Sequence, residues 1–461
     1  MPTKTLTTRL STHLFKSPTR TAILGFALLI AAGTALLMSP AASVGDSLSL
    51  IDALFMSTSA SCVTGLSVMD IGHGLTLFGQ LVILSLIQIG GLGILTISTL
   101  LLLMMKGRAS ISGQAMIQDT FTYGGGRHTA ADLLRAIFIT AFSIETVGML
   151  CLYLRMAPDI GWGRAVYPAL FHSVSAFCNA GFSLYSDSLT RFREDWVING
   201  VIAVLIIMGG IGFVVIADLR RRYFSRKIPG NRLSLHSRLA LTTSAILIAF
   251  GAAAILLMEW HNSLAPLSIP DRILAALFQS ITARTAGFNT VDIGVMANET
   301  LFMLGILMFI GACPGSCGGG IKTTTFAGLV VQGVSRMRGL RRPRVFQRTL
   351  TEASMAKATS LVMMSMAVII LGTMVLLMSE LGEISHTATR GRFLELLFEA
   401  ISAFGTVGLS TGGTASLSSW GRLTISALMF IGRLGPMVIG LALSREHFSR
   451  CQFAEENIMI G

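Results

Sequence analysis

A segment of 16 residues recurs four times in this chain and constrains the fold more than any other feature. Each copy begins with Leu-Phe, continues with alternating small and hydroxyl residues, and ends near a glycine followed by leucine or phenylalanine. The copies read ALFMSTSASCVTGLSV (residues 53–68), ALFHSVSAFCNAGFSL (169–184), ALFQSITARTAGFNTV (276–291) and LLFEAISAFGTVGLST (396–411). Because each copy stands between two apolar stretches, the sequence predicts a unit of outer helix, re-entrant segment and inner helix, repeated four times.

Apolar stretches exclude a soluble fold. The chain of 461 residues is 52% hydrophobic and only 13% charged, whereas soluble domains are about 25% charged. Runs of about 20 apolar residues can cross a bilayer, and eight stretches qualify: residues 21–38, 75–105, 136–156, 197–218, 239–258, 301–310 with its continuation, 361–381 and 423–443. The first follows a basic stretch without a convincing cleavage site, so we interpret it as a membrane helix and not as a removed signal.

Basic residues gather in alternate loops. The formal net charge is +12, and most of the 35 lysines and arginines fall in residues 4–20, 106–135, 220–238, 322–357 and 445–450. These clusters lie on one side if the chain crosses the membrane twice between neighbouring clusters, which is the positive-inside distribution. Both termini are then cytoplasmic. Membrane lipids with anionic headgroups are the expected contact of these loops, and nucleic acid is not.

The repeated segment is too short to cross the membrane. Residues 53–62 would span about 15 Å as a helix, roughly half the hydrocarbon core, so this helix would enter from outside and stop near the middle. Its carbonyl end carries partial negative charge, and the glycine that follows permits close backbone approach. Four such strands around one axis would surround a cation with carbonyl oxygens. The residues expected in this filter are Val63, Thr64, Gly65, Asn179, Ala180, Gly181, Thr285, Ala286, Gly287, Thr406, Val407 and Gly408.

Glycine motifs also recur in the inner helices, as IGGLG (residues 89–93), MGGIG (208–212), IGACPGSCGGG (310–320) and IGRLG (431–435). The third is close to the phosphate-binding pattern G-x-x-x-x-G-K-[ST], but its lysine comes one residue late and no soluble strand precedes it. Proline and glycines interrupt a helix, and irregular backbone at membrane depth occurs only inside protein or beside a water-filled cavity. We therefore expect this loop to face a pathway and not to bind a nucleotide.

A few polar residues in or beside these segments need separate explanations. Glu145 and Gln88 are expected to make interhelical contacts, and His172 lacks partners for a metal site. Arg284 is the charged residue beside the filter, and we expect its side chain to point behind it. Arg433 is a costly charge within an inner helix, which usually faces the interior or a cavity. The six cysteines show no disulfide framework, so CPGSC is interpreted as close packing of small residues.

The chain resembles the Trk/Ktr/HKT superfamily of potassium-uptake proteins. The motifs VTGL, NAGF, TAGFNT and TVGLSTGG, with PGSCGGGIKTTT, are specific in combination, and the resemblance covers nearly the whole chain. It is closest to the KtrB type of membrane subunit, because the first outer helix starts near Thr21 and the two extra helices of TrkH-type proteins are not seen before it. A TrkH-type or a sodium-permeable member of the superfamily remains the alternative.

The resemblance implies an all-α membrane protein with four tandem outer-helix, pore-helix and inner-helix repeats around one central pore. The repeats would occupy residues 21–105, 106–219, 220–331 and 332–443, between cytoplasmic segments 1–20 and 444–461. Potassium would pass passively through the filter of a bacterial inner (cell) membrane protein, with sodium as a candidate activator and no covalent cofactor. Glycine at Gly65, where sodium-permeable plant relatives can have serine, favours potassium. The partners would be a second copy of the subunit and a KtrA-like cytosolic ring of nucleotide-binding regulatory subunits.

The resemblance also implies a gate. Family members have a broken third inner helix whose loop obstructs the pore below the filter, and a basic residue of the fourth inner helix stands near that loop. The matching residues are Cys313, Pro314, Gly315, Ser316, Cys317, Gly318, Gly319, Gly320, Lys322 and Arg433.

Two other classes of function fit the sequence less well. A membrane-embedded enzyme would need a catalytic constellation, and no His/Cys/carboxylate cluster or nucleophile–base pair stands out, so no enzymatic activity is expected. A structural scaffold would not explain four pore-like segments.

Overall fold

The structure is a computed structural model that describes residues 18–104, 130–224, 233–340, 342–385 and 387–435. Within these ranges the chain is almost entirely helical, and the strands are confined to a short hairpin of β1 (Arg344–Val345) and β2 (Arg348–Thr349). The mostly helical fold expected from the sequence is therefore confirmed. The basic clusters at residues 4–20, 106–135, 220–238 and 322–357 lie partly, and those at 445–450 wholly, outside the described residues.

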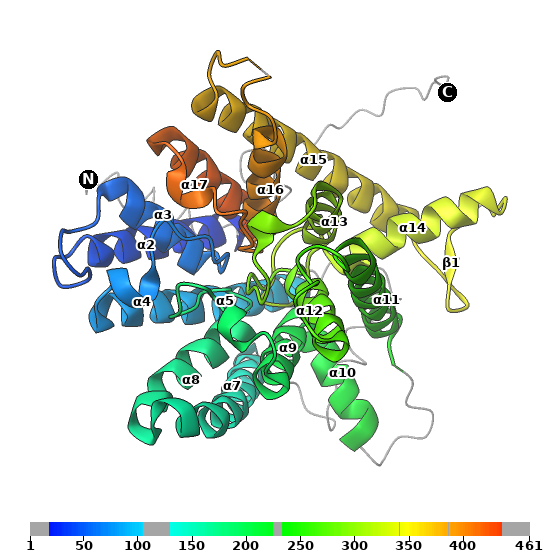
Figure 1. The fold of residues 1–461 in the computed structure, drawn as a ribbon. Coiled ribbons are helices and arrows are strands. Elements are labelled where there is room, and N and C mark those ends of the chain that lie inside the picture. Colours follow the sequence, from blue (N-terminus) through cyan, green and yellow to red (C-terminus); the bar gives the residue numbers. More distant parts are fainter. Residues whose placement is uncertain (1–17, 105–129, 225–232, 341, 386, 436–461) are drawn as a thin grey trace, which may run out of the picture.

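The helices form four groups of three around a common centre (Figure 1). In each group an outer helix packs on a short helix and on a second helix that follows it. The groups are α2 (Pro18–Leu37), α3 (Leu50–Ser61) and α5 (Leu77–Met104); α7 (Ala130–Ile160), α8 (Trp162–Phe177) and α9 (Trp196–Ile211); α11 (Leu235–Met258), α12 (Ile269–Thr282) and α13 (Asn298–Phe309); and α15 (Glu352–Glu380), α16 (Arg392–Gly405) and α17 (Ser419–Leu434).

Contacts between the groups close a circle. Helix α5 packs on α8, α9 on α12, α13 on α16, and α17 of the last group on α3 of the first. The chain therefore runs once around the centre in sequence order, and its last described helix completes the ring of contacts (Figure 1).

Long apolar helices indicate a multi-pass membrane protein. Among the described residues, three helices are long and apolar enough to cross a bilayer, namely Leu134–Ile160, Leu235–Met258 and Glu352–Glu380, and the bent pair Trp196–Ile211 and Phe213–Tyr223 would make a fourth span if counted as one. Shorter apolar helices at Ala22–Leu37, Leu77–Gly93 and Asn298–Phe309 match three more of the expected stretches. Large side chains such as Leu28 and Leu257 are 70% and 80% exposed on this surface, which suits contact with lipid and not with water.

The stretch 197–218 is not the single element that the sequence suggested. Helix α9 ends at Ile211, α10 (Phe213–Phe224) begins at once, and the two are bent by 100°. The bend occurs at Gly212, whose φ of 90° is a conformation that glycine adopts without strain. A Cβ built on Gly212 would lie 2.6 Å from the carbonyl oxygen of Pro314. The loop that contains Pro314 therefore leaves no room for a side chain at position 212.

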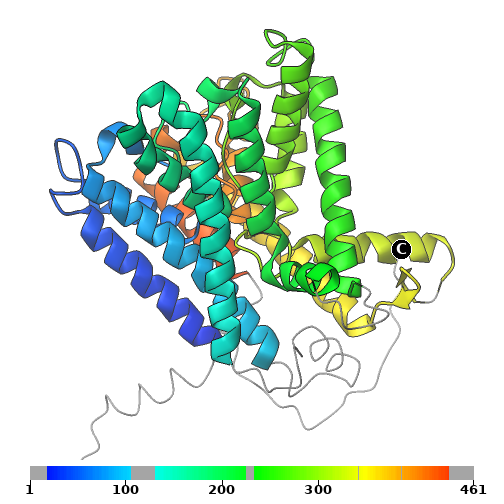
Figure 2. The ribbon, with the colours of Figure 1, turned by 90° about the horizontal axis from the view of Figure 1, so that it is seen from below.

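The third and fourth inner helices are interrupted at comparable places. Helix α13 ends at Phe309, and the chain becomes helical again only in α14 (Thr323–Met337), which runs crosswise to the long helices at one end of the molecule (Figure 2). Helix α17 ends at Leu434, before Gly435 with a φ of 85°. The rest of the expected stretch 423–443 lies outside the described residues.

The conserved spacing within the repeated segment reflects the core. The phenylalanine of its Leu-Phe pair is at most 1% exposed in every copy: Phe55, Phe171, Phe278 and Phe398. The serines, threonines and alanines that follow are buried too, because their small side chains let the short helices pack closely. The phenylalanine and the small residues thus anchor each short helix between its neighbours.

Two acids, the buried Glu259 and the half-buried Glu380, join outer and inner helices in the same way. Glu259, just after α11, accepts a hydrogen bond from the amide of Ala297, just before α13, at 2.9 Å. Glu380, the last residue of α15, accepts from the amide of Ser418, just before α17, at 3.1 Å. A carboxylate at a helix N-terminus is favourable because it pairs with free amides and the helix dipole. These bonds make the third and fourth groups alike beyond the repeated segment.

Candidate functional site

Four short backbone segments meet at the centre of the fold, each following one of the short helices α3, α8, α12 and α16 (Figure 1). Each contains a glycine at positive φ and, two residues earlier, a non-glycine residue in the left-handed region. The φ angles are 99°, 69°, 80° and 92° for Gly65, Gly181, Gly287 and Gly408, and 57°, 60°, 72° and 49° for Val63, Asn179, Thr285 and Thr406. Left-handed non-glycine residues are uncommon, so the repeated sequence produces a distinctive backbone shape four times.

The four glycines close a ring. A Cβ built on each would lie closer to the Cα of another than ordinary van der Waals contact allows: 3.2 Å from Gly65 to Gly181, 2.8 Å from Gly181 to Gly287, 3.2 Å from Gly287 to Gly408, and 3.0 Å from Gly408 to Gly65. The same Cβ atoms would meet the carbonyl oxygens of Ala180, Ala286, Val407 and Thr64. Backbone therefore approaches backbone around the ring, and no side chain fits at the glycine positions.

Serine hydroxyls support the first and fourth segments in the same way. Ser59 Oγ accepts a hydrogen bond from the Gly65 amide at 3.1 Å, and Ser402 Oγ accepts one from the Gly408 amide at 3.1 Å. Both serines stand six residues before the glycine. The alternation of hydroxyl residues in the repeat thus holds the backbone that follows the helix.

The C-terminal ends of α3, α8, α12 and α16 converge on this ring, because each segment directly follows its helix. The carbonyl end of a helix carries partial negative charge. Carbonyl oxygens and helix ends together favour a cation at the centre without a carboxylate in the ring.

The loop between α13 and α14 has a closed stem. The amide of Gly311 donates to the carbonyl of Ile321 at 2.8 Å, and the amide of Thr323 donates to the carbonyl of Ala312 at 3.2 Å. Thr323 Oγ1 also donates to the carbonyl of Gly311 at 3.0 Å. Residues 313–322 therefore form a loop whose two ends are joined at its base.

The loop lies directly against the ring. The amide of Gly319 donates to Thr406 Oγ1 at 3.0 Å. A Cβ built on Gly318 would lie 3.1 Å from the Cβ of Thr285, and one on Gly319 3.2 Å from the Cβ of Thr406. The third and fourth ring segments are thus in contact with glycines of the loop.

The loop also fills the bend of the second inner helix. The amides of Cys313 and Cys317 donate to the carbonyls of Gly210 and Gly209 at 3.0 and 3.2 Å, and the amide of Phe213 donates to the carbonyl of Gly315 at 2.9 Å. Free carbonyls at the end of α9 are satisfied by the loop. Because three hydrogen bonds join the two elements, the loop and the bend depend on each other.

Two basic side chains contact the loop from within the protein. Arg433 on α17 is 4% exposed and donates to the carbonyl of Cys317 and, at 2.9 Å, to that of Gly90. Lys322 Nζ donates to the carbonyl of Gly318 at 2.6 Å. Both therefore place positive charge beside the loop while bonding its backbone oxygens.

The remaining polar residues singled out in the sequence also have partners. Gln88 Nε2 donates to both carboxylate oxygens of Glu145 at 3.1 and 3.0 Å, which confirms the expected interhelical contact. His172 contacts the Pro168 carbonyl at 2.8 Å and Ser183 Oγ at 3.0 Å. The bond to Pro168 lies within α8, and the bond to Ser183 joins α8 to the segment that follows Gly181.

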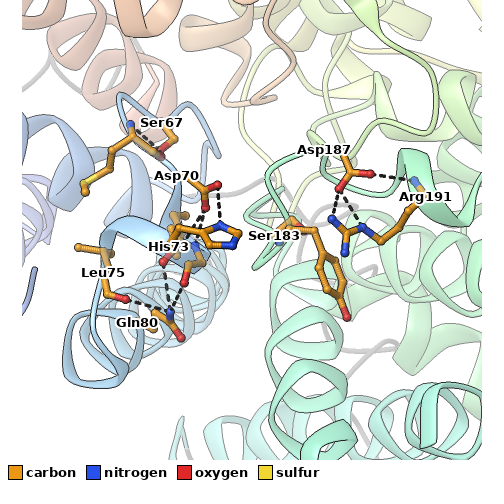
Figure 3. A network of polar contacts seen from close by, with 12 residues as sticks. Ser67, Asp70, His73, Leu75, Gln80, Ser183, Asp187 and Arg191 are labelled. Atoms are coloured by element: carbon orange, nitrogen blue, oxygen red, sulfur yellow. Dashed lines mark hydrogen bonds and ion pairs between the residues drawn. The ribbon is translucent and has the colours of Figure 1, made fainter. Parts of the chain in front are cut away.

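Two clusters of polar contacts lie on the segments that follow the first two glycines (Figure 3). Asp70 precedes the short helix α4 (Ile71–Gly74), and its Oδ1 accepts from the amides of Gly72 and His73 at 2.8 and 3.1 Å. Partial burial alone would raise the pKa of Asp70, but hydrogen bonds from Ser186 and His73 and from these amides outweigh it and lower the pKa. The two segments are close neighbours here, because a Cβ built on Gly72 would meet the carbonyl oxygen of Leu184.

The second polar cluster surrounds Asp187 (Figure 3). Its Oδ1 accepts from Arg191 Nε at 2.9 Å. Burial alone would raise the pKa of Asp187, but the Arg191 side chain reverses this and lowers it. The Arg191 guanidinium also stands 4.3 Å from the ring centre of Tyr185. Sequence reasoning missed both clusters. Asp70 could have been found, because aspartate is a preferred N-cap residue.

The structure brings all expected filter residues to one place and puts the expected gate loop against them. It also adds contacts that the sequence did not suggest: Thr406 with Gly319, and Gly212 with the loop. Ser316 Oγ donates to the Cys313 carbonyl at 2.6 Å, within the loop. No ring or loop pattern in the sequence specifies which of the four equivalent residues, Val63, Asn179, Thr285 and Thr406, would contact the loop.

Comparisons with known proteins agree on one family. The family described as TrkH, cation transport protein, matches residues 5–450 of this chain. Ktr system potassium uptake protein B of Bacillus subtilis is 37% identical over 451 residues, covering 96% of this chain and 97% of that protein. Potassium/sodium uptake protein NtpJ of Enterococcus hirae is 34% identical over 453 residues, covering 96% and 97%.

Among solved structures, the potassium transporter TrkH from Vibrio parahaemolyticus has a similar fold, with a TM-score of 0.73 and 19% identity. The similarity covers 94% of this chain and 86% of that one. The family match, the relatives and the fold lead to the same conclusion: the chain belongs to the TrkH family of cation transport proteins.

Proposed function

We propose that this protein is the potassium-translocating membrane subunit of a bacterial potassium uptake system. The observation that carries the proposal is the closed ring of four glycines with its carbonyl oxygens. Two relatives that are at least 34% identical over nearly the whole chain are named as potassium, or potassium and sodium, uptake proteins. An enzyme is the less favoured class, because the family is one of transport proteins.

The ring serves as a selectivity filter. Carbonyl oxygens of Thr64, Ala180, Ala286 and Val407 and of the adjoining positions replace the hydration shell of potassium. The four groups of helices act as four pore repeats around this filter, with α3, α8, α12 and α16 as pore helices. Potassium then binds through backbone oxygens, and selectivity depends on the spacing that glycine permits.

The loop of residues 313–322 serves as the gate. Its glycines contact the third and fourth ring segments, which we call filter strands from here on. The loop therefore lies where it would obstruct a pathway through the ring. Arg433 and Lys322 add positive charge beside it. A passing cation is repelled by such charges more strongly in a low-dielectric pore than in water. Moving the loop away from the ring and from α9 would open the pathway.

The subunit works with partners. The name Ktr system in its relatives suggests a regulatory subunit, and we propose a homodimer that sits on a KtrA-like cytosolic ring of nucleotide-binding subunits, with sodium as a candidate activator. Both termini lie on the cytoplasmic side of the inner membrane, where α10, α14 and the hairpin provide arginines for contact with the ring or with lipid. A sodium-permeable or TrkH-type member is the second candidate, supported by the name of the Enterococcus relative.

Growth on limiting potassium tests the function. Expression of the chain in a bacterium that lacks potassium uptake should restore growth, and tracer potassium uptake should rise. Added sodium distinguishes a sodium-activated from a sodium-independent system. Expression of a folded protein at the membrane without rescue, with and without a co-expressed regulatory subunit, would contradict the proposal. Preferential uptake of tracer sodium would favour the second candidate.

A further inference from the structure

Arg284 is a buried cation directly next to the third filter strand. It precedes Thr285 and is 8% exposed. One guanidinium nitrogen donates to the carbonyl of Ser244 at 3.4 Å, and the other donates to Ser244 Oγ and to Thr323 Oγ1, both at 3.1 Å. All of these partners are neutral oxygens. A charge in such a place is stable only while these hydrogen bonds are kept.

The partners of Arg284 lie on the outer helix α11 and at the end of the loop, and these partners in turn contact the start of the loop. Thr323 is the first residue of α14, where the loop ends. Cys313, where the loop begins, has its Sγ 3.7 Å from Thr323 Oγ1 and 3.5 Å from Ser244 Oγ. One buried cluster of Arg284, Ser244, Cys313 and Thr323 therefore connects α11, both ends of the loop and the filter.

The connection to the filter is short. Arg284 and Thr285 are adjacent, and Thr285 is a left-handed residue with a φ of 72°. Its neighbours in space are the loop glycine Gly318 and the second filter strand. A residue held in this strained conformation persists only while its surroundings fix it. If the stem of the loop moves, the Arg284 cluster must either move with it, which shifts Thr285, or leave a buried charge without hydrogen bonds.

We propose that Arg284 is a positioning residue that ties the third filter strand to both ends of the loop, so that the position of the loop sets the selectivity of the filter. This inference rests on the proposed function, because it takes the ring as the filter and the loop as the gate. Opening the gate then changes the spacing of the carbonyl oxygens at Thr285, and the ratio of potassium to sodium flux changes with it.

The test compares that ratio in variants at both ends of the connection. Full-length protein in proteoliposomes is assayed for tracer potassium and tracer sodium flux. Arg284→Gln and Thr323→Val should each lower the potassium/sodium ratio by about tenfold, the factor that corresponds to one charge-assisted hydrogen bond. The double variant should be no worse than the single ones, because both remove the same bond. Thr323→Ser, which keeps the hydroxyl, should retain the wild-type ratio.

Thr323 and the double variant decide the outcome together. The Thr323 hydroxyl contacts Arg284 and also donates to the Gly311 carbonyl in the loop stem, and an effect through the stem alone would add to that of Arg284→Gln. Arg272→Gln is the matched control: Arg272 is on α12, the helix that Arg284 follows, and donates to three carbonyls, at Leu267, Trp260 and Ala265, away from the ring. It should lower stability and leave the ratio unchanged. If Arg284→Gln does not fold, Thr323→Val and Ser244→Ala carry the test alone.

Two results overturn the inference: a folded Thr323→Val variant with the wild-type ratio, or a double variant whose effects simply add. Failure of the proposed function would look different, because wild-type protein would then conduct no potassium. A wild-type protein that conducts potassium, with variants of unchanged ratio, rejects only the role of Arg284.

Discussion

The hydrogen bond between the loop and the fourth filter strand gives the sharpest prediction for the gate. Thr406→Val replaces the hydroxyl that accepts from the Gly319 amide at 3.0 Å. The substitution fits the backbone, because the equivalent residue of the first strand is already a valine, Val63, with a φ of 57° against 49° for Thr406. The backbone conformation at residue 406 is therefore kept, and only the hydroxyl that accepts the hydrogen bond is removed.

The expected size follows from the burial of the amide. With the loop in place, the Gly319 amide of the variant is buried without an acceptor, which costs about 1–3 kcal/mol. With the loop displaced, the amide can find water, so this cost disappears. The ratio of open to closed protein should then rise about 5- to 150-fold, and potassium flux without the regulatory partner should rise in proportion while the open form is rare.

Tracer potassium flux in proteoliposomes without the partner measures this. Thr406→Ser, which keeps the hydroxyl, should stay near the wild-type flux. Thr424→Val is the matched control, since Thr424 only bonds the Trp420 carbonyl of its own helix. If folded Thr406→Val conducts no more than Thr424→Val, the loop is not held closed by this bond.

Three further predictions follow from the site. Gly65→Ser should lower the potassium/sodium flux ratio, because a Cβ there meets the next strand at a φ of 99°, whereas Gly200→Ser, on an open helix surface, should not; equal ratios would contradict the placement of the filter. Arg433→Ala should raise partner-free tracer flux by removing positive charge beside the loop, and unchanged flux in folded protein would argue against an electrostatic gate. The lowered pKa of Asp70 contributes stability that is present above the unfolded pKa of about 3.9 and is lost as pH falls through the folded pKa. The melting temperature of wild type should therefore exceed that of Asp70→Asn near pH 7, and the difference should shrink below about pH 4; a difference that persists there would exclude this carboxylate as its cause.

Most of the helical fold could be predicted from local sequence patterns. The Leu-Phe pair, the alternating small residues and the single glycine predict a short buried helix followed by a close backbone approach, because each residue type has one physical reason to be there. Gly65, for example, has a positive φ and lies against another ring segment, as expected for a glycine that permits close backbone approach. The burial of Phe55 was learned from the structure.

Contacts between distant segments could not be predicted. The bend at Gly212 was missed because MGGIG looks like IGGLG, yet α5 continues through its glycines and α9 does not. The difference lies in the loop, whose Cys313 and Cys317 amides take the carbonyls at the end of α9. Likewise, nothing near Arg284 in sequence points to Thr323, since their contact depends on how α12 and α14 meet.

The ring of four glycines is made by one chain, with four different sequences around it. In a pore built from four identical subunits, any insertion or charge would appear four times at the axis. Four copies of a ten-residue loop would clash with one another at the axis, and four copies of Arg284 would repel one another. Covalent linkage breaks the symmetry, so one quarter of the molecule can carry the loop, another its hydrogen-bond acceptor, and a third the helix end that receives it, while all four keep the same glycine.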